Sequence, residues 1–503
     1  MTESRTPDLF DIVVVGAGSA GCALARRLTD DPSVNVALVE AGGQPHHPHI
    51  AAPTEYFKLW GTEIDWNYES VPQAGTAGRR HRLPRGRVLG GTSALNGMVY
   101  LRGAHQDFDG WAAAGCTGWG WDDVRAAYEQ LEELVLPTTF DETNALSDVF
   151  IDAARESGYR FNAFFDDGDL DGCGWNRLSI HRGERQSSYR AFIEPVLSRP
   201  NLHLITETTV QRLNVSAGAV VTGVDLGDGS GNTRRLVASE VILCAGAYES
   251  PRLLMLSGIG PAEHLRDRDV APIVDLPVGE NLQDHLLVGV VQTATREIDP
   301  LYAHITECCA FARSSSRVPS CDIEISFNKE MHFAPPIDDG VPRFTIIPGV
   351  TRLESRGTVR LPHLGSAERL VIDHGYFEES ADMTAMIEAV RRSRNIAAAP
   401  AFAEWSAGEY FPGPDVETDE ELARFVRDNV STWFHPAGSC TMGTSPGSVV
   451  APDLRVHGLS GVRVADASVM PTVVTVNTNA TSMMIGWRAA DLVLGTSPDP
   501  IDH

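Results

Sequence analysis

Three glycines near the N-terminus have the spacing of a turn that binds phosphate. Gly16, Gly18 and Gly21 follow an apolar run, and a helical pattern begins at the last of them. The first glycine allows a tight turn, the second lets backbone approach a pyrophosphate, and the third lets helix and strand pack closely. The N-terminus of such a helix offers free N–H groups and a positive dipole end to phosphates. The spacing therefore predicts a dinucleotide site.

An acid at the end of the next predicted strand supports this interpretation. Val34 to Val39 are expected to form a strand, and Glu40 closes it nineteen residues after Gly21. A carboxylate there binds ribose hydroxyls and repels a 2′-phosphate, which argues against NADP. The apolar run from Ile12 to Val15, the helix and this strand make a βαβ unit. The motif by itself leaves FAD and NAD open.

The overall composition excludes several classes of function. The chain has 503 residues and a net charge of −26, from 41 Lys plus Arg and 67 Asp plus Glu. Such a surface repels phosphate backbones, so nucleic-acid binding is not expected. The eight cysteines have no CxxC or zinc-type spacing, and no apolar run suits a membrane span or a secretory signal. We therefore expect a cytoplasmic protein with reduced cysteines.

A basic island interrupts this acidic chain. It leads into Gly90-Gly91, a tight turn followed by Thr92 and Ser93. Two interpretations are open: a solvated loop, or a basic surround for an anionic cofactor. The island consists of Arg79, Arg80, Arg82, Arg85 and Arg87.

Four segments resemble a single flavoprotein family. Two of them cover residues 86–103 (GRVLGGTSALNGMVYLRG) and 246–260 (GAYESPRLLMLSGIG), and two lie near the C-terminus (WFHPAGSCTMG and the stretch from VRVADAS onwards). In order and spacing they resemble the glucose–methanol–choline (GMC) oxidoreductases, in particular the branch of choline oxidases and choline dehydrogenases. The resemblance spans almost the whole chain and implies FAD as the cofactor.

The resemblance also implies an α/β fold of two interleaved domains. A Rossmann-like FAD-binding domain is expected from residues 1–155, 201–290 and 431–503, the last of these carrying the catalytic segment. A substrate domain, built on an antiparallel sheet covered by helices, is expected from residues 156–200 and 291–430. Residues 328–345 form either a cover for the active site or a plain connector.

The family implies where FAD binds. The segment after the double glycine lies along the flavin ring, Val210 meets the adenine through its backbone, and Asp466 lies near the ribityl chain and diphosphate. Trp66 is either a cover for the adenine or a core aromatic. The residues expected to bind FAD are Gly16, Gly18, Ser19, Ala20, Gly21, Glu40, Ala41, Trp66, Arg87, Val88, Gly91, Thr92, Asn96, Gly97, Met98, Val99, Val210, Ala245, Gly246, Phe434, Asp466, Ala467, Asn477 and Thr478.

The family places a catalytic pair at His435 and Asn477, facing the flavin. Hydride removal from an alcohol carbon requires the hydroxyl proton to leave, and a neutral imidazole is a suitable base. An amide donates a hydrogen bond to the forming alkoxide and does not compete for the proton. Asn479 is a nearby competitor, but the spacing of six residues after Pro471 favours Asn477. The expected product is an aldehyde or a ketone.

Three positions depart from the choline oxidase pattern. Leu95 stands where the flavin-tethered enzymes carry a histidine, so FAD is expected to be noncovalent. Leu287 stands where they carry a glutamate that pairs with trimethylammonium, and Ser326 falls on a further pocket histidine. A quaternary ammonium needs a carboxylate or an aromatic cage. Choline is therefore disfavoured, and a neutral alcohol is expected.

Several alternatives remain open from sequence. Oxygen, a quinone or another carrier could reoxidise the flavin, so the enzyme is either an oxidase or a dehydrogenase. A cyanohydrin lyase on the same fold and a catalytically silent flavoprotein are the rivals to alcohol oxidation. The expected partners are a small-molecule alcohol and an electron acceptor, and the chain is expected to be a monomer or a homodimer.

Two clusters imitate metal sites without meeting their requirements. The loop from Asp167 through Asp169 and Asp171 begins like a calcium loop, but Leu178 occupies the position that requires a bidentate glutamate. A histidine-rich loop has no metal-site spacing, and we interpret it as surface. No metal is expected at these histidines, which are His46, His47 and His49.

Overall fold

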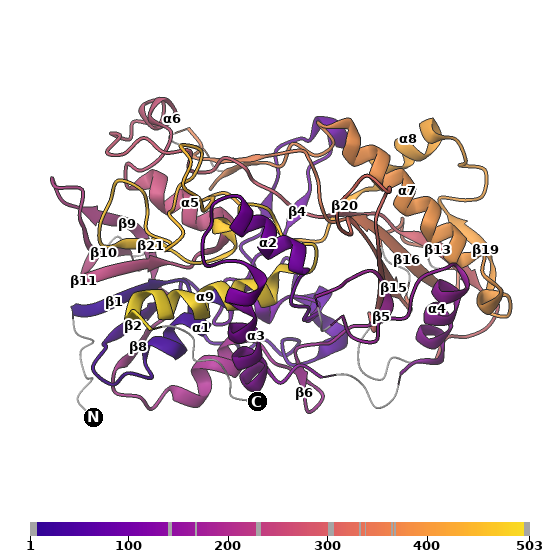
Figure 1. Ribbon diagram of the computed structural model, residues 1–503, viewed down its shortest axis with the longest axis horizontal. Coiled ribbons are helices and arrows are strands. Elements are labelled where there is room, and N and C mark those ends of the chain that lie inside the picture. The colour runs from indigo at the N-terminus through magenta and orange to yellow at the C-terminus, as the bar shows by residue number, and fades with distance from the viewer. Residues whose placement is uncertain are drawn as a thin grey trace.

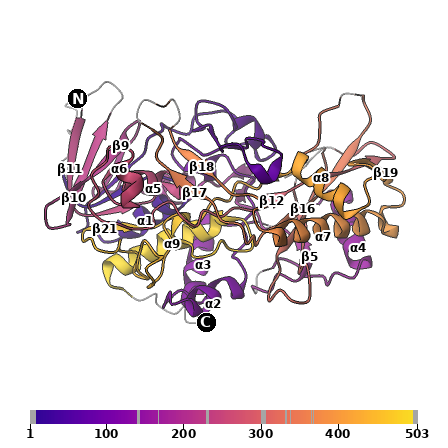
Figure 2. The same cartoon turned by 90° about the horizontal axis from the view of Figure 1, so that it is seen from above.

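The protein consists of two lobes, each built around its own sheet (Figure 1). The structure is a computed structural model. It describes residues 8–138, 143–165, 168–227, 233–299, 306–330, 333–337, 339–363, 366 and 369–496. Figure 2 shows β9, β10 and β11 at one end of the molecule and β16, β19 and α7 at the other. The mixed α/β fold expected from the sequence is confirmed.

The first sheet has seven strands, in the order β8-β2-β1-β11-β10-β9, with β21 paired to β11. Its centre is parallel, as expected for strands buried on both faces, and β9 and β10 add an antiparallel edge. Its second strand begins two residues later than predicted, because Val34 closes a turn onto the Asp31 carbonyl. The strands are β1 (Leu9–Val15), β2 (Val36–Val39), β8 (Leu202–Ile205), β9 (Thr209–Val215), β10 (Val221–Gly227), β11 (Thr233–Leu243) and β21 (Val462–Val464).

Two helices from opposite ends of the chain pack together beside this sheet. α1 (Ser19–Leu28) follows the glycine motif, and α9 (Thr478–Leu494) lies along it (Figure 1). Gly486 of α9 lies against the backbone of Ala20, which allows the close approach. From the sequence, Met483, Met484 and Trp487 suggest an amphipathic helix after Asn477, and this prediction is wrong. The residues of α9 are buried on nearly every side, because α1 and α3 (Trp121–Val135) both cover it.

The second sheet has eight strands and is antiparallel. α7 (Ser380–Ala397) packs on one face, and α4 (Ala145–Glu156) covers the edge near β14 and β5. The sequence TDEELARFV predicts a capping box of Thr418 and Glu421, and α8 (Asp419–Asn429) begins there. The strands are β5 (Gly172–Trp175), β12 (Leu286–Leu287), β13 (Val290–Ala294), β14 (Cys308–Ala312), β15 (Ile323–Asn328), β16 (Arg343–Val350), β19 (Ser406–Phe411) and β20 (Ser431–Thr432).

The chain passes between the lobes several times. The first sheet draws on residues 9–39, 202–243 and 462–464, and the second on residues 172–175 and 286–432. The remaining helices are α2 (His105–Ala113), α5 (Gly246–Leu256) and α6 (Ala262–Arg266). The short strand pairs are β3 (Tyr68–Glu69) with β4 (Arg82–Leu83), β6 (Ile180–His181) with β7 (Glu184–Arg185), and β17 (Thr358–Arg360) with β18 (Val371–Asp373).

No helix in the described part of the chain is long and apolar enough to cross a membrane. All eight cysteines lie in described segments, and all are buried and free of disulfides.

The contact between α1 and α9 makes a first prediction. A Cβ atom at Gly486 would lie 2.1 Å from the Ala20 carbonyl oxygen. Gly486→Ala should therefore destabilise the protein by about 1–3 kcal/mol, because backbone must move to admit the methyl group. The measurement is the apparent melting temperature.

Gly110→Ala in α2 is the matched control, because an added Cβ there meets nothing within 4 Å. It should stabilise the protein by about 0.5–1 kcal/mol through helix propensity. Equal melting temperatures for the two variants would contradict the packing argument.

Candidate active site

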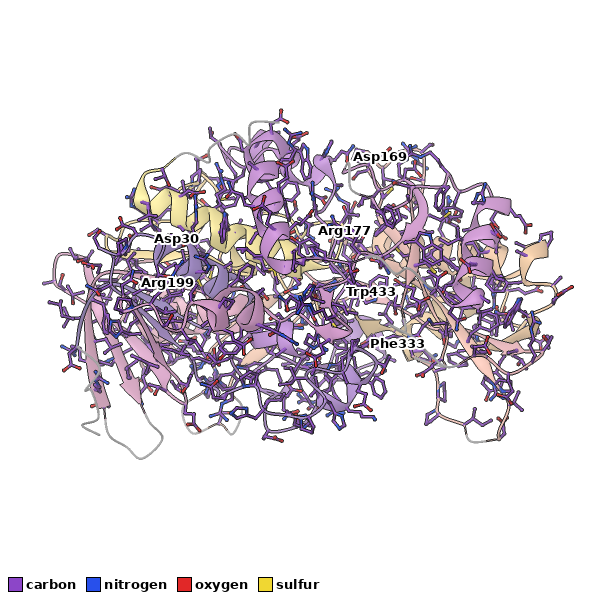
Figure 3. The ribbon with its side chains drawn as sticks, turned by 90° about the horizontal axis from the view of Figure 1, so that it is seen from below. Asp30, Asp169, Arg177, Arg199, Phe333 and Trp433 are labelled. Carbon is purple, nitrogen blue, oxygen red and sulfur yellow. The ribbon has the colours of Figure 1, made fainter. Side chains whose placement is uncertain are left out.

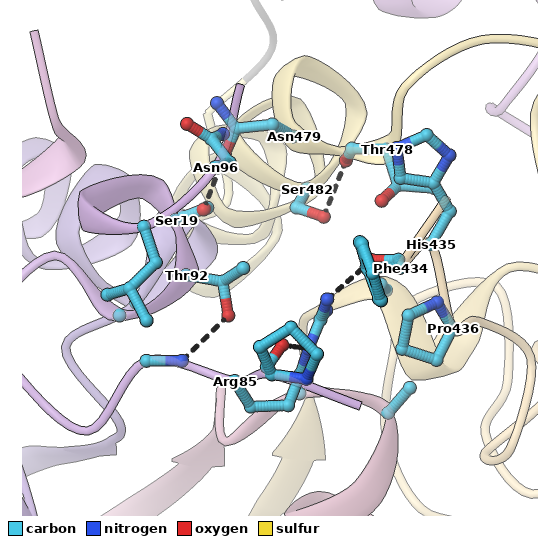
Figure 4. A pocket seen from close by; sticks show the side chains of 18 of the residues that line it. Ser19, Arg85, Thr92, Asn96, Phe434, His435, Pro436, Thr478, Asn479 and Ser482 are labelled. Carbon is cyan, nitrogen blue, oxygen red and sulfur yellow. Dashed lines mark hydrogen bonds between the residues drawn. The ribbon is translucent and has the colours of Figure 1, made fainter. Parts of the chain in front are cut away.

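A pocket extends from the glycine motif of the first lobe to β15 and β16 of the second (Figure 4). Most of the residues predicted to bind a cofactor line it. They are Gly16, Gly18, Ser19, Ala20, Glu40, Ala41, Trp66, Gly91, Thr92, Asn96, Gly97, Met98, Val99, Val210, Ala245, Gly246, Phe434, Asp466, Ala467, Asn477 and Thr478, together with His435.

The N-termini of three helices converge on this pocket. α1 begins after Gly18, α5 after Ala245 and α9 after Asn477, and in none of them does the side chain of the N-cap residue cap the helix. Uncapped N–H groups and the positive ends of helix dipoles attract anions. Three such ends in one pocket favour a ligand with several negative charges, such as a diphosphate.

The glycine motif and the Gly90-Gly91 segment lie against each other in the pocket wall. Gly91 has a φ of +53°, which favours glycine, and a Cβ there would lie 2.7 Å from the Cα of Gly18. The GG segment therefore touches the glycine motif directly. Gly21 does not line the pocket, since its role is to let α1 approach the turn. An added Cβ at Gly21 would meet the Gly16 carbonyl oxygen.

Two carboxyl groups of the pocket are bound to backbone. Glu40 accepts hydrogen bonds from the N–H groups of Ala17 (3.0 Å) and Gly42 (2.8 Å), and burial raises its pKa to about 7. Asp466 accepts from the N–H of Gly246 (2.8 Å) and the hydroxyl of Ser250 (2.5 Å). Burial also raises the pKa of Asp466. Both acids therefore fix the turns from which cofactor-facing N–H groups project.

The arginine island has divided roles. Arg85 lines the pocket and donates to the Phe434 carbonyl at 2.5 Å. Arg87 and Val88 do not line the pocket, although both were predicted to bind the cofactor. Val88 is fully buried. The Arg87 guanidinium lies 5.2 Å from the ring centroid of Trp66 and lowers the pKa of Glu40. Arg85 and Arg87 therefore act mainly on residues of the pocket wall, namely Phe434, Trp66 and Glu40.

The segment before His435 is held in a strained conformation. Phe434 has a φ of +64°, which is uncommon for a bulky side chain. Its carbonyl accepts from Arg85, and its N–H donates to the Thr432 hydroxyl at 2.7 Å. Its ring packs edge-on against Trp60, with the ring centroids 5.0 Å apart. These contacts fix the backbone before His435 and therefore the direction in which its side chain points.

Asp284 anchors the same segment from behind. Its buried carboxylate accepts from the backbone N–H groups of His285 (2.9 Å) and His435 (2.8 Å). It also accepts from the hydroxyls of Tyr376 (2.8 Å) and Thr432 (2.5 Å). A buried carboxyl with four donors is well satisfied, so it can hold these segments in one arrangement.

His435 and Asn477 meet inside the pocket. The Asn477 Nδ2 atom lies 3.2 Å from His435 Nε2, and His435 Nδ1 lies 2.9 Å from His285 Nδ1. Burial holds the pKa of His435 well below its ordinary value of 6.5, and His285 and Arg85 add to this effect. The imidazole is therefore neutral at pH 7. Asn479 instead accepts a hydrogen bond from Ser19 at 2.7 Å (Figure 4).

Several pocket residues were missed in the sequence. Figure 3 shows Phe333 and Trp433 in the region between the two lobes. On β15, the residues Glu324, Ser326 and Asn328 all line the pocket, and only the middle one was considered. Their spacing of two is the signal that could have revealed them, because alternate residues of a strand share a face. Other pocket residues not predicted as cofactor contacts include Tyr56, Trp60, Tyr68, Arg85, Tyr248, Glu249, Ile347, Arg369 and Asn479.

The structure also locates the positions noted for other reasons. Leu287 is fully buried in β12 and is not among the residues that line the pocket. Asp167 lies outside the described residues, and Asp169 pairs with Arg160 at 2.6 Å. Within the described ranges, no group of His, Cys, Asp and Glu has an arrangement that could hold a metal ion.

Comparison with known proteins assigns the family. The sequence profiles of the GMC oxidoreductases match residues 10–287 and 354–486. The chain belongs to the GMC oxidoreductase family. It is 38% identical to choline oxidase of Arthrobacter globiformis, over 96% of this chain and 94% of that protein. It is 35% identical to an alcohol dehydrogenase (acceptor) of Pseudomonas putida, over 97% and 96%.

A solved structure agrees with this assignment. The crystal structure of pyridoxine 4-oxidase from Mesorbium loti superposes with a TM-score of 0.90 at 33% identity, over 96% of this chain and 98% of that one. GMC oxidoreductases are FAD flavoproteins, so the family and the cofactor expected from the sequence are confirmed.

Two buried polar atoms of this GMC oxidoreductase also fit a bound FAD. Asn477 Oδ1 and Asn479 Nδ2 are buried at the N-terminus of α9 and have no hydrogen-bond partner within the described structure. Buried amide atoms without partners are costly, so these two atoms fit a ligand that accepts and donates hydrogen bonds there.

Close contact between the two glycine segments makes a second prediction. Gly91→Ala should lower the amount of FAD bound per chain, because the added Cβ collides with Gly18 where the backbone meets the phosphates. The measurement is the ratio of flavin absorbance to protein absorbance after purification.

Gly78→Ala is the control, since Gly78 also has a positive φ of +74° but an added Cβ there meets nothing within 4 Å. Its flavin content should remain close to that of the wild type. A full flavin complement in Gly91→Ala would contradict the assignment of this contact to the cofactor site.

Proposed function

We propose that this GMC oxidoreductase oxidises the CH–OH group of a small alcohol to an aldehyde or ketone, with His435 as the base and Asn477 as its hydrogen-bonding partner. The observation that carries the proposal is the 3.2 Å contact between Asn477 Nδ2 and His435 Nε2 inside the pocket. The names of two relatives, an alcohol dehydrogenase and a pyridoxine oxidase, support the chemistry.

The two histidines define which nitrogen acts. Their Nδ1 atoms are 2.9 Å apart, so one must donate a proton to the other. With the proton on His435 Nδ1, the Nε2 lone pair faces Asn477 and the pocket. His285 then accepts, and burial keeps it neutral by lowering its pKa to about 4. With this assignment of the shared proton, His435 Nε2 is the atom that removes the hydroxyl proton.

The other groups orient the substrate and the cofactor. Bound FAD supplies the hydride acceptor. Asn477 donates from its amide toward the oxygen that becomes charged as its proton leaves. The N-terminus of α9 adds a positive potential beside it. Asp284, Arg85 and Thr432 keep the backbone around His435 in place.

Two positions that depart from the choline oxidase pattern bear on how FAD is held and on whether choline is a substrate. Leu95 lines the pocket in place of a tethering histidine, which supports noncovalent FAD. Leu287 is aliphatic and lies outside the pocket lining, so its position provides no carboxylate for a trimethylammonium group. The chain is proposed to work in the cytoplasm, and its eight free cysteines support this. Oxygen uptake measured against dye reduction would identify the electron acceptor.

Removal of the base tests the proposal directly. His435→Ala should slow anaerobic flavin bleaching by an alcohol by about 10²–10⁴-fold, because general-base catalysis is lost. The measurement is stopped-flow absorbance with a panel of aromatic alcohols, aliphatic alcohols, sugars and choline.

The exposed His363, which lies outside the pocket lining, provides the control His363→Ala, which should bleach at the wild-type rate. If His435→Ala retains FAD and bleaches as fast as the wild type, His435 is not the base. If no alcohol bleaches the wild-type flavin, the oxidation itself is contradicted.

The depressed pKa of His435 predicts the pH dependence. A base acts in its neutral form, and a lowered pKa extends that form to more acidic pH. The second-order rate constant for flavin reduction should therefore stay constant from pH 8 down through 6.5 and decline only at more acidic pH. An acidic limb with its midpoint at 6.5 or above, in protein that circular dichroism shows to be folded, would contradict a buried neutral base.

A further inference from the structure

One acid in the pocket has no role in the chemistry described so far. Glu324 lies on β15, and its side chain is buried, with 3% of its surface exposed. Its Oε1 atom accepts from the Ser326 hydroxyl at 2.8 Å, whereas its Oε2 atom has no hydrogen-bond partner in the described structure. A buried carboxyl oxygen without a donor is destabilising, so such an atom suggests a missing partner.

The sheet determines where this carboxyl points. Ile323, Ile325 and Phe327 of β15 pack into the core under α4 and α7. The alternate residues Glu324 and Ser326 must therefore face the other way, and both line the pocket that contains His435. Strand register fixes the backbone of Glu324, so its side chain stays on the face of β15 that lines the pocket.

An indole lies close to the backbone of the neighbouring strand. Glu324 is directly opposite Gly349 of β16, and a Cβ on Gly349 would lie 2.3 Å from a ring carbon of Trp433. Trp433 also lines the pocket and precedes His435 by two residues. The backbone N–H of Trp433 donates to the His285 carbonyl at 3.0 Å, which ties this residue to the catalytic segment. A carboxyl on β15 and an indole that packs over the adjacent strand β16 therefore both lie in the pocket that contains the base.

The chain does not supply a cation for this carboxyl among the residues that the structure describes. Two arginines line the pocket, but both are bonded elsewhere. Arg85 donates to the Phe434 and Pro84 carbonyls, and Arg369 pairs with Glu249 at 2.7 Å. No positive group among the described residues therefore pairs with Glu324, which leaves its carboxyl available to a cation from a ligand.

We infer that Glu324 and Trp433 bind the protonated amine of an amino alcohol, so that its hydroxyl reaches His435. The inference rests on the proposed function and specifies its substrate class. An N–H⁺ group can donate a charge-assisted hydrogen bond to the free Oε2 atom, and its charge is attracted to the face of the indole. A quaternary ammonium has no N–H and cannot make the first of these contacts. Choline would therefore keep the charge attraction but lose the hydrogen bond, so amines that carry an N–H are favoured over it.

Glu324 is also suited to respond to such a ligand. Burial raises its pKa to about 7, so the empty pocket does not hold a full charge there. An arriving cation favours the ionised form, and the pair is then buried with its hydrogen bonds made. A neutral alcohol of the same shape gains nothing from this ionisation.

The test compares two alcohols of nearly equal shape on the wild type and on Glu324→Gln. The cationic alcohol is 2-(dimethylamino)ethanol and the neutral one is 3-methylbutan-1-ol. The wild type should have the higher kcat/KM for the cation, and Glu324→Gln should reduce the cation-to-neutral ratio by about 10–100-fold, mainly through KM. The kcat/KM for the neutral alcohol should change by less than about 3-fold. An unchanged ratio in Glu324→Gln would overturn the inference.

Two further variants make the result specific. Glu297→Gln makes the same chemical change at an exposed residue outside the pocket lining, and it should leave the ratio unchanged. Trp433→Leu keeps the carboxyl and should lower the ratio by about 2–10-fold through loss of the cation–π contact. If Glu324→Gln does not fold with FAD, the Trp433→Leu result decides: an unchanged ratio there would overturn the inference.

A binding measurement separates this inference from the proposed function. Protonated N,N-dimethylethylamine has the amine but no hydroxyl, so its binding can be titrated calorimetrically without turnover. It should bind the FAD-loaded wild type about 10-fold or more tightly than Glu324→Gln. Equal affinity would overturn the amine site even if alcohols are oxidised. Weaker binding to the variant would support the site even if no alcohol bleaches the flavin.

Discussion

The buried carboxylate of Asp284 is the interaction on which the active centre depends. It accepts hydrogen bonds from four donors, which belong to His285, Thr432, Tyr376 and His435. Three of these donors lie far from Asp284 in the chain, so one carboxylate joins the segment before β12 to the segment from Thr432 to His435 and to the loop after β18. A buried acid with all its bonds made resists rearrangement, because any movement leaves a charged oxygen without a donor. The base is therefore positioned by its backbone.

Charge is distributed along the pocket in a way that the total charge of −26 does not reveal. Three helix N-termini bring positive potential to one part of it, around Gly18, Ala245 and Asn477. In the second lobe, β15 contributes Glu324 to the lining. Binding depends on the groups within a few ångströms of the ligand, because water and salt screen the distant surface. An acidic enzyme can therefore hold an anionic cofactor.

Local signals in the sequence predicted the parts that neighbouring residues build. The glycine spacing with Glu40 predicted the βαβ unit, and Thr418 with Glu421 predicted the start of α8, because turns and caps involve residues close in the chain. The amphipathic pattern suggested for α9 failed, since distant segments cover that helix on several sides. Glu324 was missed although it shares the alternate spacing of Ser326, because only the pairing of β15 with its neighbours shows that this face of the strand meets the pocket.

The sequence by itself determined the family, the cofactor and the kinds of side chain available for catalysis. Only the tertiary structure decided which of them meet. Asn477 contacts His435 whereas Asn479 turns to Ser19, because residues two apart at a helix start point in different directions. Glu324 joins the same pocket because the pairing of β15 with β16 directs it there. Contacts between residues distant in the chain follow from strand register and helix packing, which no local pattern specifies.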